Sequence, residues 1–295
     1  MLAGVNSLNA WGLVDQHDEE EFMSCIPSLV DYKENEALIA IPEEEEIKNT
    51  VNGDNAPGPN GFPMVFYVEM WEIVEGQIRE AVQDFFKRGP LNRAVCDSKV
   101  ALIPKVNDPS ALNQFWPICL CNFSYKILAT LLGIRLGSVI TRIIYPEKHG
   151  FVPGRSIQGA IDISQEMVND INLRSIGSNI MIMVDMDNAY EKMEWKLILR
   201  VMRRFGFPNW FCDLCFRCYV SPWITLTLMG KAFIFLKLVR GVRQGDPLSP
   251  SVFIMDQELL TRNIHRCLEE GNIITYRNRF GMGLVSYLMF ADDMI

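Results

Sequence analysis

Two short apolar segments, far apart in the sequence, each end in aspartate, and this feature constrains the fold more than any other. Asn179 to Val184 (NIMIMV) is followed by Asp185, and Leu284 to Phe290 leads to the pair Asp292 and Asp293. We interpret both segments as strands, the first of them buried. Carboxylates at the ends of neighbouring strands converge when the strands share a sheet. The sequence therefore predicts a fold that brings these two segments side by side.

Helical and strand-like periodicities follow one another along the rest of the chain. Gly89-Pro90 and Gly206 are typical helix ends, and Asp246-Pro247 is a typical helix start. We expect helices over 71–86, 125–144, 189–205 and 247–269, a strand over 99–104, and a hairpin over 224–238 around Gly230-Lys231. Strands and helices without strict βαβ alternation favour an α+β fold.

Acidic residues are concentrated at the start of the chain. Residues 1–50 contain 12 aspartates and glutamates against 2 lysines, whereas the whole chain has a net charge of −8. We interpret residues 1–50 as a solvated, weakly organised acidic lead, in which a short helix opens after Pro42. The remaining residues are nearly neutral, so a nucleic-acid contact would use a local basic groove rather than a global field.

Cysteine and hydropathy patterns exclude several classes of protein. The eight cysteines are scattered, and Cys212, Cys215 and Cys218 lack a neighbouring histidine or fourth cysteine, so they are predicted to be buried thiols rather than zinc ligands. No apolar run approaches the roughly 20 residues of a bilayer span, and the start of the chain lacks the basic residues of a signal peptide. We therefore expect an intracellular protein with no membrane partner.

The aspartates at the strand ends suggest phosphoryl chemistry. Clustered carboxylates repel one another unless a cation lies between them, and oxygen ligands without histidine or cysteine suit Mg²⁺. Two such ions stabilise the attacking and leaving oxygens of an in-line displacement, which is nucleotidyl transfer. The alternative is that these acids are merely solvated, as acids at strand ends commonly are.

The segment Arg240 to Pro250, RGVRQGDPLSP, is a second candidate element. Gly245 permits close approach of the backbone to a ligand, and Arg240 and Arg243 carry donors that suit phosphate. The alternative is an ordinary capped loop ahead of a helix.

Several segments together resemble a known family. RGVRQGDPLSP is similar to the signature of LINE-type (non-LTR) retroelement reverse transcriptases, FADD at 290–293 resembles their Y/F-x-D-D box, and VDMDNAYEKMEW at 184–195 resembles their first catalytic box. Further boxes follow the family's order: APGPNGF (56–62), LIPK (102–105), FWPICLCN (115–122), YKIL (125–128) and GFVPGRS (150–156). The likeness covers about residues 26–295 and is closest to plant-type elements.

The resemblance implies the fingers and palm of a right-hand polymerase. It divides the chain into the acidic lead (1–50), an N-terminal extension (51–97) and the reverse-transcriptase domain (98–295). We find no segment for a thumb or for the family's endonuclease. The chain is therefore interpreted as a truncated copy, in which the second strand of the hairpin after Asp293 is missing.

The same resemblance implies roles for individual residues. Asp185 and Asp292 would bind two Mg²⁺ ions, with Mn²⁺ as a substitute, and Asp293 would support them. Tyr190 would lie under the sugar and reject a 2′-hydroxyl. The nucleotide-binding residues would be Lys105, Tyr190, Gln244 and Gly245, and the contacts to template or primer would be Arg155, Arg240 and Arg243. The implied partners are an RNA template, a DNA primer and dNTPs, and the implied location is the nucleus.

The chain departs from the family pattern at several positions. Trp116 replaces an arginine expected to pair with the triphosphate, which costs roughly 2–4 kcal/mol of transition-state stabilisation. Asn188 replaces a lysine, and Asp187 adds an acid that either increases repulsion near Asp185 or faces solvent. We therefore expect little or no processive synthesis from this copy, and we predict that Trp116→Arg raises its activity.

Three alternatives stay open. The chain could be a nucleic-acid-binding remnant without catalysis, which would bind RNA–DNA hybrid in a salt-dependent way. It could be a gene-model relic that does not fold, because a sheet cut through its catalytic hairpin exposes an unpaired edge. A related polymerase, such as an intron-encoded maturase or telomerase, fits the RQGDPLSP and FVPGR segments less well.

Overall fold

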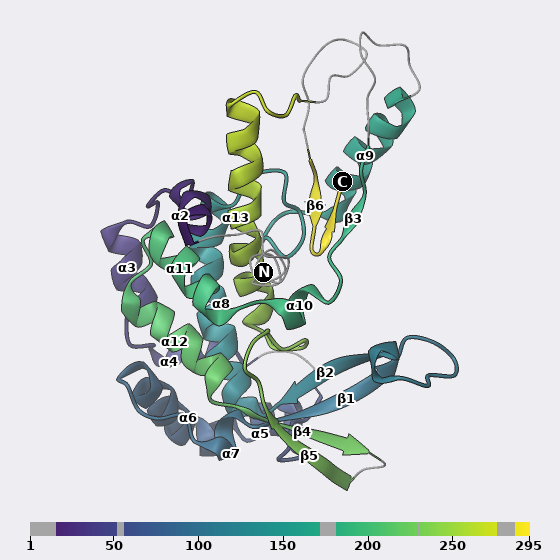
Figure 1. Ribbon diagram of the computed structural model, residues 1–295. Helices are drawn as coiled ribbons and strands as arrows, with labels where there is room; N and C mark the ends of the chain where they lie inside the picture. The colour runs from purple at the N-terminus through teal and green to yellow at the C-terminus, as the bar shows by residue number, and fades with distance from the viewer. Residues whose placement is uncertain (1–15, 52–55, 172–180, 229–230, 276–286) are drawn as a thin grey trace. The chain divides into compact units, whose positions relative to one another are not determined.

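The computed structural model describes residues 16–51, 56–171, 181–228, 231–275 and 287–295, and the chain forms two compact units (Figure 1). Unit 1 comprises residues 1–29, 137–205 and 251–295, and unit 2 comprises residues 30–136 and 206–250. Both units contain helices and strands, so the mixed α and β composition predicted from the sequence is confirmed.

Unit 2 is built on a four-stranded sheet in the order β2–β1–β4–β5. Its strands are β1 (Ser98–Pro104), β2 (Phe115–Cys121), β4 (Trp223–Leu228) and β5 (Lys231–Lys237). β1 pairs antiparallel with β2 and parallel with β4, while β4 and β5 form an antiparallel hairpin. The predicted strand over 99–104 and the hairpin over 224–238 are confirmed, although the predicted turn residue Gly230 lies outside the described residues.

Unit 2 also contains helices. They are α3 (Tyr32–Ile39), α4 (Glu44–Asn49), α5 (Met64–Glu69), α6 (Trp71–Phe86), α7 (Arg93–Cys96), α12 (Asn209–Val220) and the first part of α8 (Phe123–Ile143). α6 has the predicted bounds, and it buries most of the apolar stripe read from the sequence, each such side chain stabilising the fold by about 1.5–3 kcal/mol. Cys212, Cys215 and Cys218 are buried in α12, as predicted.

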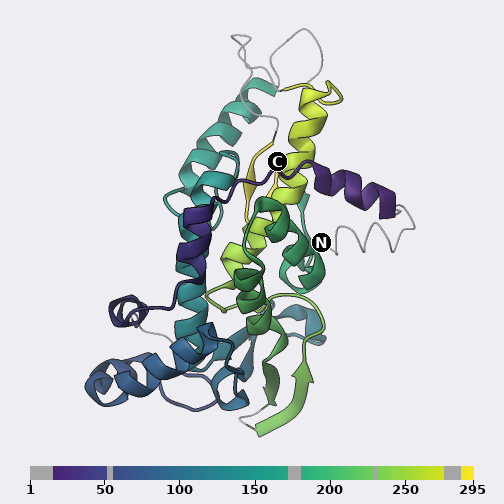
Figure 2. The same ribbon diagram turned by 90° about the vertical axis from the view of Figure 1, so that its left-hand side faces the viewer.

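Unit 1 combines helices with a three-stranded sheet in the order β3–β7–β6. The strands are β3 (Val184–Asp185), β6 (Met289–Phe290) and β7 (Asp293–Met294). The helices are α2 (Gln16–Ser24), α9 (Ile157–Ile171), α10 (Ala189–Lys192), α11 (Trp195–Phe205) and most of α13 (Ser249–Glu269). The β6–β7 hairpin, yellow in the figures, lies between α9 and α13 in both views (Figures 1 and 2).

The helix α8 is long and strongly apolar, and its bounds lie within two residues of the predicted 125–144. By length and composition alone it could cross a bilayer, which the sequence analysis did not anticipate. However, 67% of its most apolar window is buried inside the protein, as in the core helix of a globular domain.

The interpretation of residues 1–50 as weakly organised is wrong for their described part. Three helices, α2 to α4, lie there, and α3 begins with a capping box in which Asp31 and Glu34 each accept a hydrogen bond from the other's backbone N–H. The acids are also paired, since Glu46 forms a 2.7 Å salt bridge with Arg135, a residue that is 91% buried. Apolar side chains from this region enter the core, namely Met23, Ile26, Val30, Leu38 and Ile47. Composition could not show that basic residues distant in sequence neutralise the charge run.

Two other predicted helices have different bounds. The stretch 189–205 divides into α10 and α11, because Met193 between them has an extended ψ of 140°. α13 begins at Ser249 rather than at Pro247, after a turn in which the Asp246 carboxylate accepts a hydrogen bond from the backbone N–H of Leu248 at 3.0 Å. Gly206 adopts a φ of +98° after α11, as predicted for a C-terminal cap.

Candidate functional site

The two aspartate-ending segments do lie side by side. β3 pairs antiparallel with β7, and the register sets Asp185 directly opposite Asp293. Asp292 lies in the turn between β6 and β7, where its carbonyl oxygen accepts a 3.2 Å hydrogen bond from the backbone N–H of Met186. Side chains directly opposite in an antiparallel pair share one face, with Cβ atoms about 4.5–5.5 Å apart. The backbone thus gathers carboxylates from two distant stretches.

The three carboxylates differ in exposure. Asp185 and Asp293 are exposed, and Asp292 is half-buried. Within the part of the chain that the structure describes, no three side chains of His, Cys, Asp or Glu are close enough together to hold a metal ion. The strand register therefore places Asp185 opposite Asp293 with Asp292 nearby, but it does not by itself form a complete set of metal ligands.

Two details of this sheet correct the sequence analysis. The described part of the segment before Asp185 is not a buried strand, since Ile182 is 66% and Met183 is 77% exposed, and β3 pairs over two residues only; Asn179 and Ile180 lie outside the described residues. An apolar run alone does not reveal whether both faces of a strand are covered. The second hairpin strand is also not missing, because β7 forms and Ile295 exchanges two backbone hydrogen bonds with Leu288, at 2.8 and 2.9 Å.

Tyr190 lies on α10, near Asp292 in the hairpin of β6 and β7, which is here called the carboxylate hairpin. Its ring stacks on Phe253 with centroids 4.8 Å apart and meets Phe151 edge-on at 6.4 Å. Burial raises the pKa of its hydroxyl well above the usual value, and the negative charge of Asp292 raises it further. The phenol therefore stays neutral, and its aromatic neighbours fix the plane of its ring.

The extra acid Asp187 is exposed, in line with one of the two expectations, and it also has partners of its own. Its carboxylate forms a 2.8 Å salt bridge with Lys192 and accepts a 2.6 Å hydrogen bond from the side chain of Asn188. Asn188 has a φ of +50°, a left-handed conformation that asparagine tolerates better than most residues.

Arg243 is buried, which contradicts its predicted contact with template or primer. The guanidinium donates to the Asp246 carboxylate at 2.6 Å, to the Ser98 hydroxyl at 2.7 Å and to the Cys218 carbonyl at 3.1 Å. It also lies 4.4 Å from the ring centroid of Tyr125, whose hydroxyl donates to Asp246 at 2.6 Å. The arginine cannot reach a nucleic acid because its donors hold the RGVRQGDPLSP loop to α8, α12 and β1.

Gln244 and Gly245 lie between these buried anchors. The Gln244 carbonyl oxygen accepts a 2.7 Å hydrogen bond from the backbone N–H of Cys119, in an isolated bridge to β2. Gly245 has a φ of +89°, and a Cβ there would lie 2.9 Å from the Cys119 carbonyl oxygen. The close approach predicted for this glycine is therefore to β2 of the chain itself, and the nucleotide-binding roles of both residues stay predictions.

The remaining predicted contacts have different environments. Arg155 is half-buried and donates to the carbonyls of Ile144, Tyr145 and Lys148 at 2.5–2.9 Å, so it holds the chain after α8, and its contact with a template strand stays a prediction. Lys105 and Arg240 are exposed, which leaves their predicted roles open. Trp116 is 48% exposed on β2, where an arginine would be free to reach a ligand.

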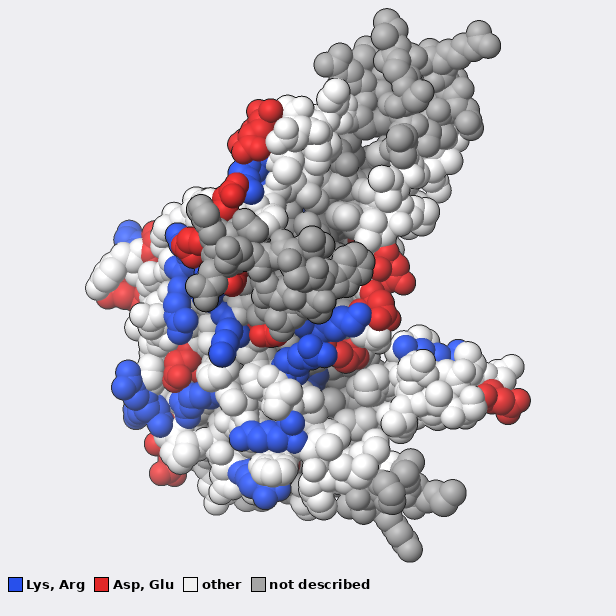
Figure 3. Space-filling model, viewed as in Figure 1, with Lys and Arg blue, Asp and Glu red and all other residues white. Residues whose placement is uncertain are grey.

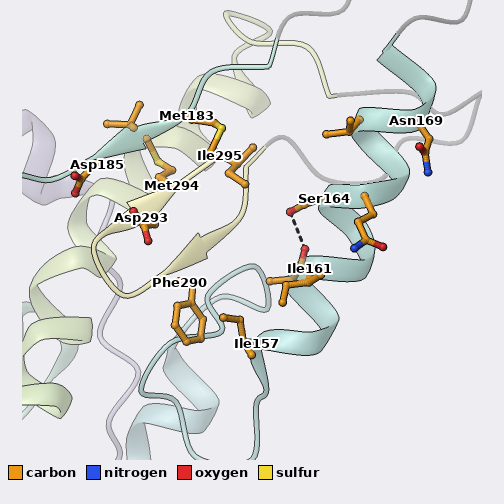
Figure 4. Close-up of a pocket in the computed structure, with 14 residues that line it drawn as sticks. Ile157, Ile161, Ser164, Asn169, Met183, Asp185, Phe290, Asp293, Met294 and Ile295 are labelled. Carbon is orange, nitrogen blue, oxygen red and sulfur yellow. Dashed lines mark hydrogen bonds between the residues drawn. The ribbon is translucent and has the colours of Figure 1, made fainter.

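An open groove of about 650 Å³ adjoins the carboxylates within unit 1 (Figure 4). Its walls are largely apolar and come from α9, β3, β6 and β7. Asp185 and Asp293 stand at the end of the groove away from Asn169 in the view of Figure 4. On the face drawn in Figure 3, both basic and acidic side chains are exposed among the coloured residues.

The sequence analysis did not identify the buried polar residues that hold the candidate segments of the two units in place. Tyr125 and Asp246 are fully buried partners in unit 2, and Lys148 and Glu258 form a buried pair in unit 1. The available signal was a charged or hydroxyl-bearing residue within an otherwise apolar helical stripe. That signal identifies a residue that needs a partner but not the partner itself, which lies more than 100 residues away in both cases.

Residues 103–295 match the family model described as reverse transcriptase (RNA-dependent DNA polymerase). Because the match covers more than half of the chain, the protein belongs to the reverse-transcriptase family.

The relatives narrow this class to retrotransposon proteins. The chain is 22% identical to the transposon TX1 uncharacterized 149 kDa protein of Xenopus laevis, over 79% of this chain and 18% of that protein. It is 24% identical to the Pol polyprotein from the type-1 retrotransposable element R2 of Nasonia vitripennis (86% and 23% covered), and 26% identical to that from the type-2 element R2DM of Drosophila melanogaster (87% and 23%). The predicted resemblance to non-LTR reverse transcriptases is confirmed. The chain spans about a fifth of the length of these relatives.

Proposed function

We propose that this chain is the RNA-directed DNA polymerase region of a non-LTR retroelement, which adds deoxynucleotides to a DNA primer on an RNA template in the nucleus. The observation that carries the proposal is the register of β3 against β7, which sets Asp185 opposite Asp293 with Asp292 in the adjoining turn. The family match supplies the reaction class.

The chemistry of the donor set fits a hard divalent cation. Like charges directly opposite in a sheet destabilise it, and a cation between them offsets that repulsion. Asp185, Asp292 and Asp293 would hold Mg²⁺, or Mn²⁺ in its place. When bound, such an ion stabilises the charge that develops in an in-line phosphoryl displacement.

The chain's own residues would bind and orient the substrates. Tyr190, neutral and stacked on Phe253, offers an aromatic surface to the incoming sugar. The exposed Lys105 and Arg240 are the predicted cations for triphosphate and template, and Gln244 and Gly245 are the other nucleotide-binding residues predicted in unit 2. We assign unit 1, with the carboxylate hairpin, to the palm, and unit 2, with the β1–β2 hairpin, to the fingers.

Primer extension tests this function. The protein is incubated with a DNA primer annealed to an RNA template, dNTPs and Mg²⁺ or Mn²⁺, beside an Asp292→Asn variant, and single-nucleotide incorporation is measured. We expect incorporation that the substitution abolishes. Incorporation that is unchanged in the variant would exclude these acids as the site.

Two further outcomes distinguish the alternatives. Binding of the hybrid that weakens with salt, without any incorporation in either metal, would indicate a nucleic-acid-binding remnant. A chain with no cooperative melting transition would indicate a sequence that does not fold stably.

A further inference from the structure

The loop of residues 147–150, here called the clamp loop, extends the sheet that carries Asp292. The backbone N–H of Met289 donates to the Glu147 carbonyl at 3.0 Å, and the N–H of His149 donates to the Met289 carbonyl at 2.9 Å. Lys148 and Met289 form a parallel bridge. β6 therefore pairs with β7 on one edge and with the clamp loop on the other, so the loop fixes β6 two residues before the Asp292 turn.

The last residue of the clamp loop touches that turn directly. Gly150 is buried, and a Cβ at this position would lie 2.3 Å from the backbone nitrogen of Ala291 and 3.1 Å from its Cα. Ala291 itself has a φ of +54°, so it already adopts a conformation that a residue with a Cβ rarely takes. Any side chain at position 150 would push the backbone that leads into Asp292.

The Lys148 side chain anchors the clamp loop in the core. It is 2% exposed, and its ammonium lies 3.5 Å from the Glu258 carboxylate and donates to the Ile254 carbonyl at 3.4 Å, both on α13. Glu258 is fully buried and is also 3.3 Å from Arg262. Burial lowers the pKa of Lys148 to about 8, and the neighbouring Glu258 opposes this by favouring the charged form.

Arg155 holds the loop by a separate contact. Its guanidinium donates to the Lys148 carbonyl at 2.7 Å, in addition to the carbonyls after α8. The clamp loop is thus fixed through its backbone at β6, through a carbonyl at Arg155 and through the Lys148 ammonium at α13. A buried charge is retained at this place although an apolar side chain would cost less desolvation.

From these contacts we infer that Lys148, paired with Glu258, and Gly150 are positioning residues that set the Asp292 turn against β3. The inference rests on the proposed function only for its catalytic consequence. Both residues are buried, and both act through Met289 and Ala291. Because a displacement of 1 Å at a reacting group can lower a rate by 100-fold, a small movement of this turn would reduce turnover at saturating substrate more than it affects binding.

Amide hydrogen exchange of residues 287–295 tests the positioning without any reference to activity. Lys148→Met should increase exchange in this segment by roughly tenfold or more. The matched control is Lys126→Met, another buried lysine, whose ammonium donates to the Ala56 carbonyl in unit 2, and it should leave exchange in 287–295 unchanged. Equal exchange in wild type and Lys148→Met would overturn the inference.

Gly150→Ala provides a second test should Lys148→Met fail to fold. Gly159→Ala is its control, because a Cβ at Gly159 meets only the His149 ring at an ordinary 3.5 Å. Mn²⁺ affinity, followed by electron paramagnetic resonance, should fall by about tenfold in Gly150→Ala and stay constant in Gly159→Ala. An unchanged affinity in Gly150→Ala would overturn the inference.

Incorporation kinetics then separate this inference from the proposed function. The turnover number should fall by roughly 10- to 100-fold in Lys148→Met and Gly150→Ala, while KM for dNTP and hybrid affinity change less than about threefold. A rise in KM for dNTP together with a fall in turnover and a loss of hybrid binding would indicate general unfolding and would overturn the positioning role. If the unmodified protein incorporates nothing, the proposed function fails, and the exchange and Mn²⁺ results alone decide whether the clamp loop sets the Asp292 turn.

Discussion

The carboxylate hairpin and the RGVRQGDPLSP loop are both motif segments, yet they are held in opposite ways. The hairpin and its partner strand β3 are built from strands of two residues, and Asp293 on β7 and Asp185 on β3 are exposed. In the loop, by contrast, the side chains of Arg243 and Asp246 are 1% and 0% exposed and form a 2.6 Å salt bridge.

The difference shows that residues within one motif do different work. An acid that ligates a metal or a substrate must stay accessible, so other residues have to hold its backbone. A buried arginine is unavailable to ligands and instead ties a loop to the core. Gln244 and Gly245 lie between the buried residues Arg243 and Asp246, which explains how the backbone of this loop can be held in a fixed position.

Substituting an acid of the β3–β7 pair should have the largest effect on activity, with little effect on stability. Asp185→Asn removes one of the opposed carboxylates, so incorporation should fall by roughly 1000-fold, or about 4 kcal/mol of transition-state stabilisation. Its free energy of unfolding should stay within about 1 kcal/mol of wild type, since an exposed repulsion is relieved. Asp187→Asn, an exposed acid paired with Lys192, is the control. An equal loss of incorporation in Asp185→Asn and Asp187→Asn would show that the position opposite Asp293 has no special role.

Substituting the loop arginine should affect stability first. Arg243→Met leaves Asp246 buried without its cation, so the free energy of unfolding should fall by about 3–5 kcal/mol, measured by urea denaturation. Arg240→Met, at an exposed position of the same loop, should change it by no more than about 0.5 kcal/mol and instead weaken hybrid binding. If Arg243→Met unfolds like wild type, the buried cluster does not hold the loop.

A buried acid on α13 should make stability depend on pH. Burial raises the pKa of Asp256 from 3.8 to about 6, so the folded state binds its proton more tightly than the unfolded state does. Stability from this group is therefore complete below about pH 4 and is lost as pH rises through 6, a difference of about 3 kcal/mol.

Asp256→Asn should recover that loss. Its melting temperature should exceed that of wild type at pH 8 and match it near pH 4, because the amide carries no charge at either pH. A stabilisation that is equal at both pH values would show that packing, rather than ionisation, governs this site.

The smallest of these effects should come from Trp116. Trp116→Arg places a guanidinium on the exposed part of β2, and KM for dNTP should fall by roughly 30-fold, or about 2 kcal/mol. Trp116→Lys carries the same charge without the bidentate geometry, so it should recover only part of the gain. An equal gain from both substitutions would indicate a general charge effect, and no gain would show that this contact is dispensable.

Much of the fold was predictable from local pattern. The helix α6 has the expected bounds because its apolar stripe and the Gly89-Pro90 stop are both local features. The hairpin of β4 and β5 was predictable for the same reason. Within residues 16–51, the short helix expected after Pro42 is confirmed as α4, but α2 and α3 were not predictable, because the partners that stabilise them are distant in sequence, as when Glu20 meets Arg200.

For the candidate site, the sequence by itself determined which residue types carry the chemistry, since acids at strand ends and the family's boxes are visible as strings. Only the tertiary structure decided which of those residues are accessible. Arg243 and Arg155 look like ligand contacts in the sequence. In the structure their guanidinium groups donate hydrogen bonds to acceptors of the protein itself, namely the Asp246 carboxylate and the carbonyls after α8. The physical reason is that a hydrogen bond or a salt bridge is made in space, and a sequence records the donor without recording which acceptor folding brings to it.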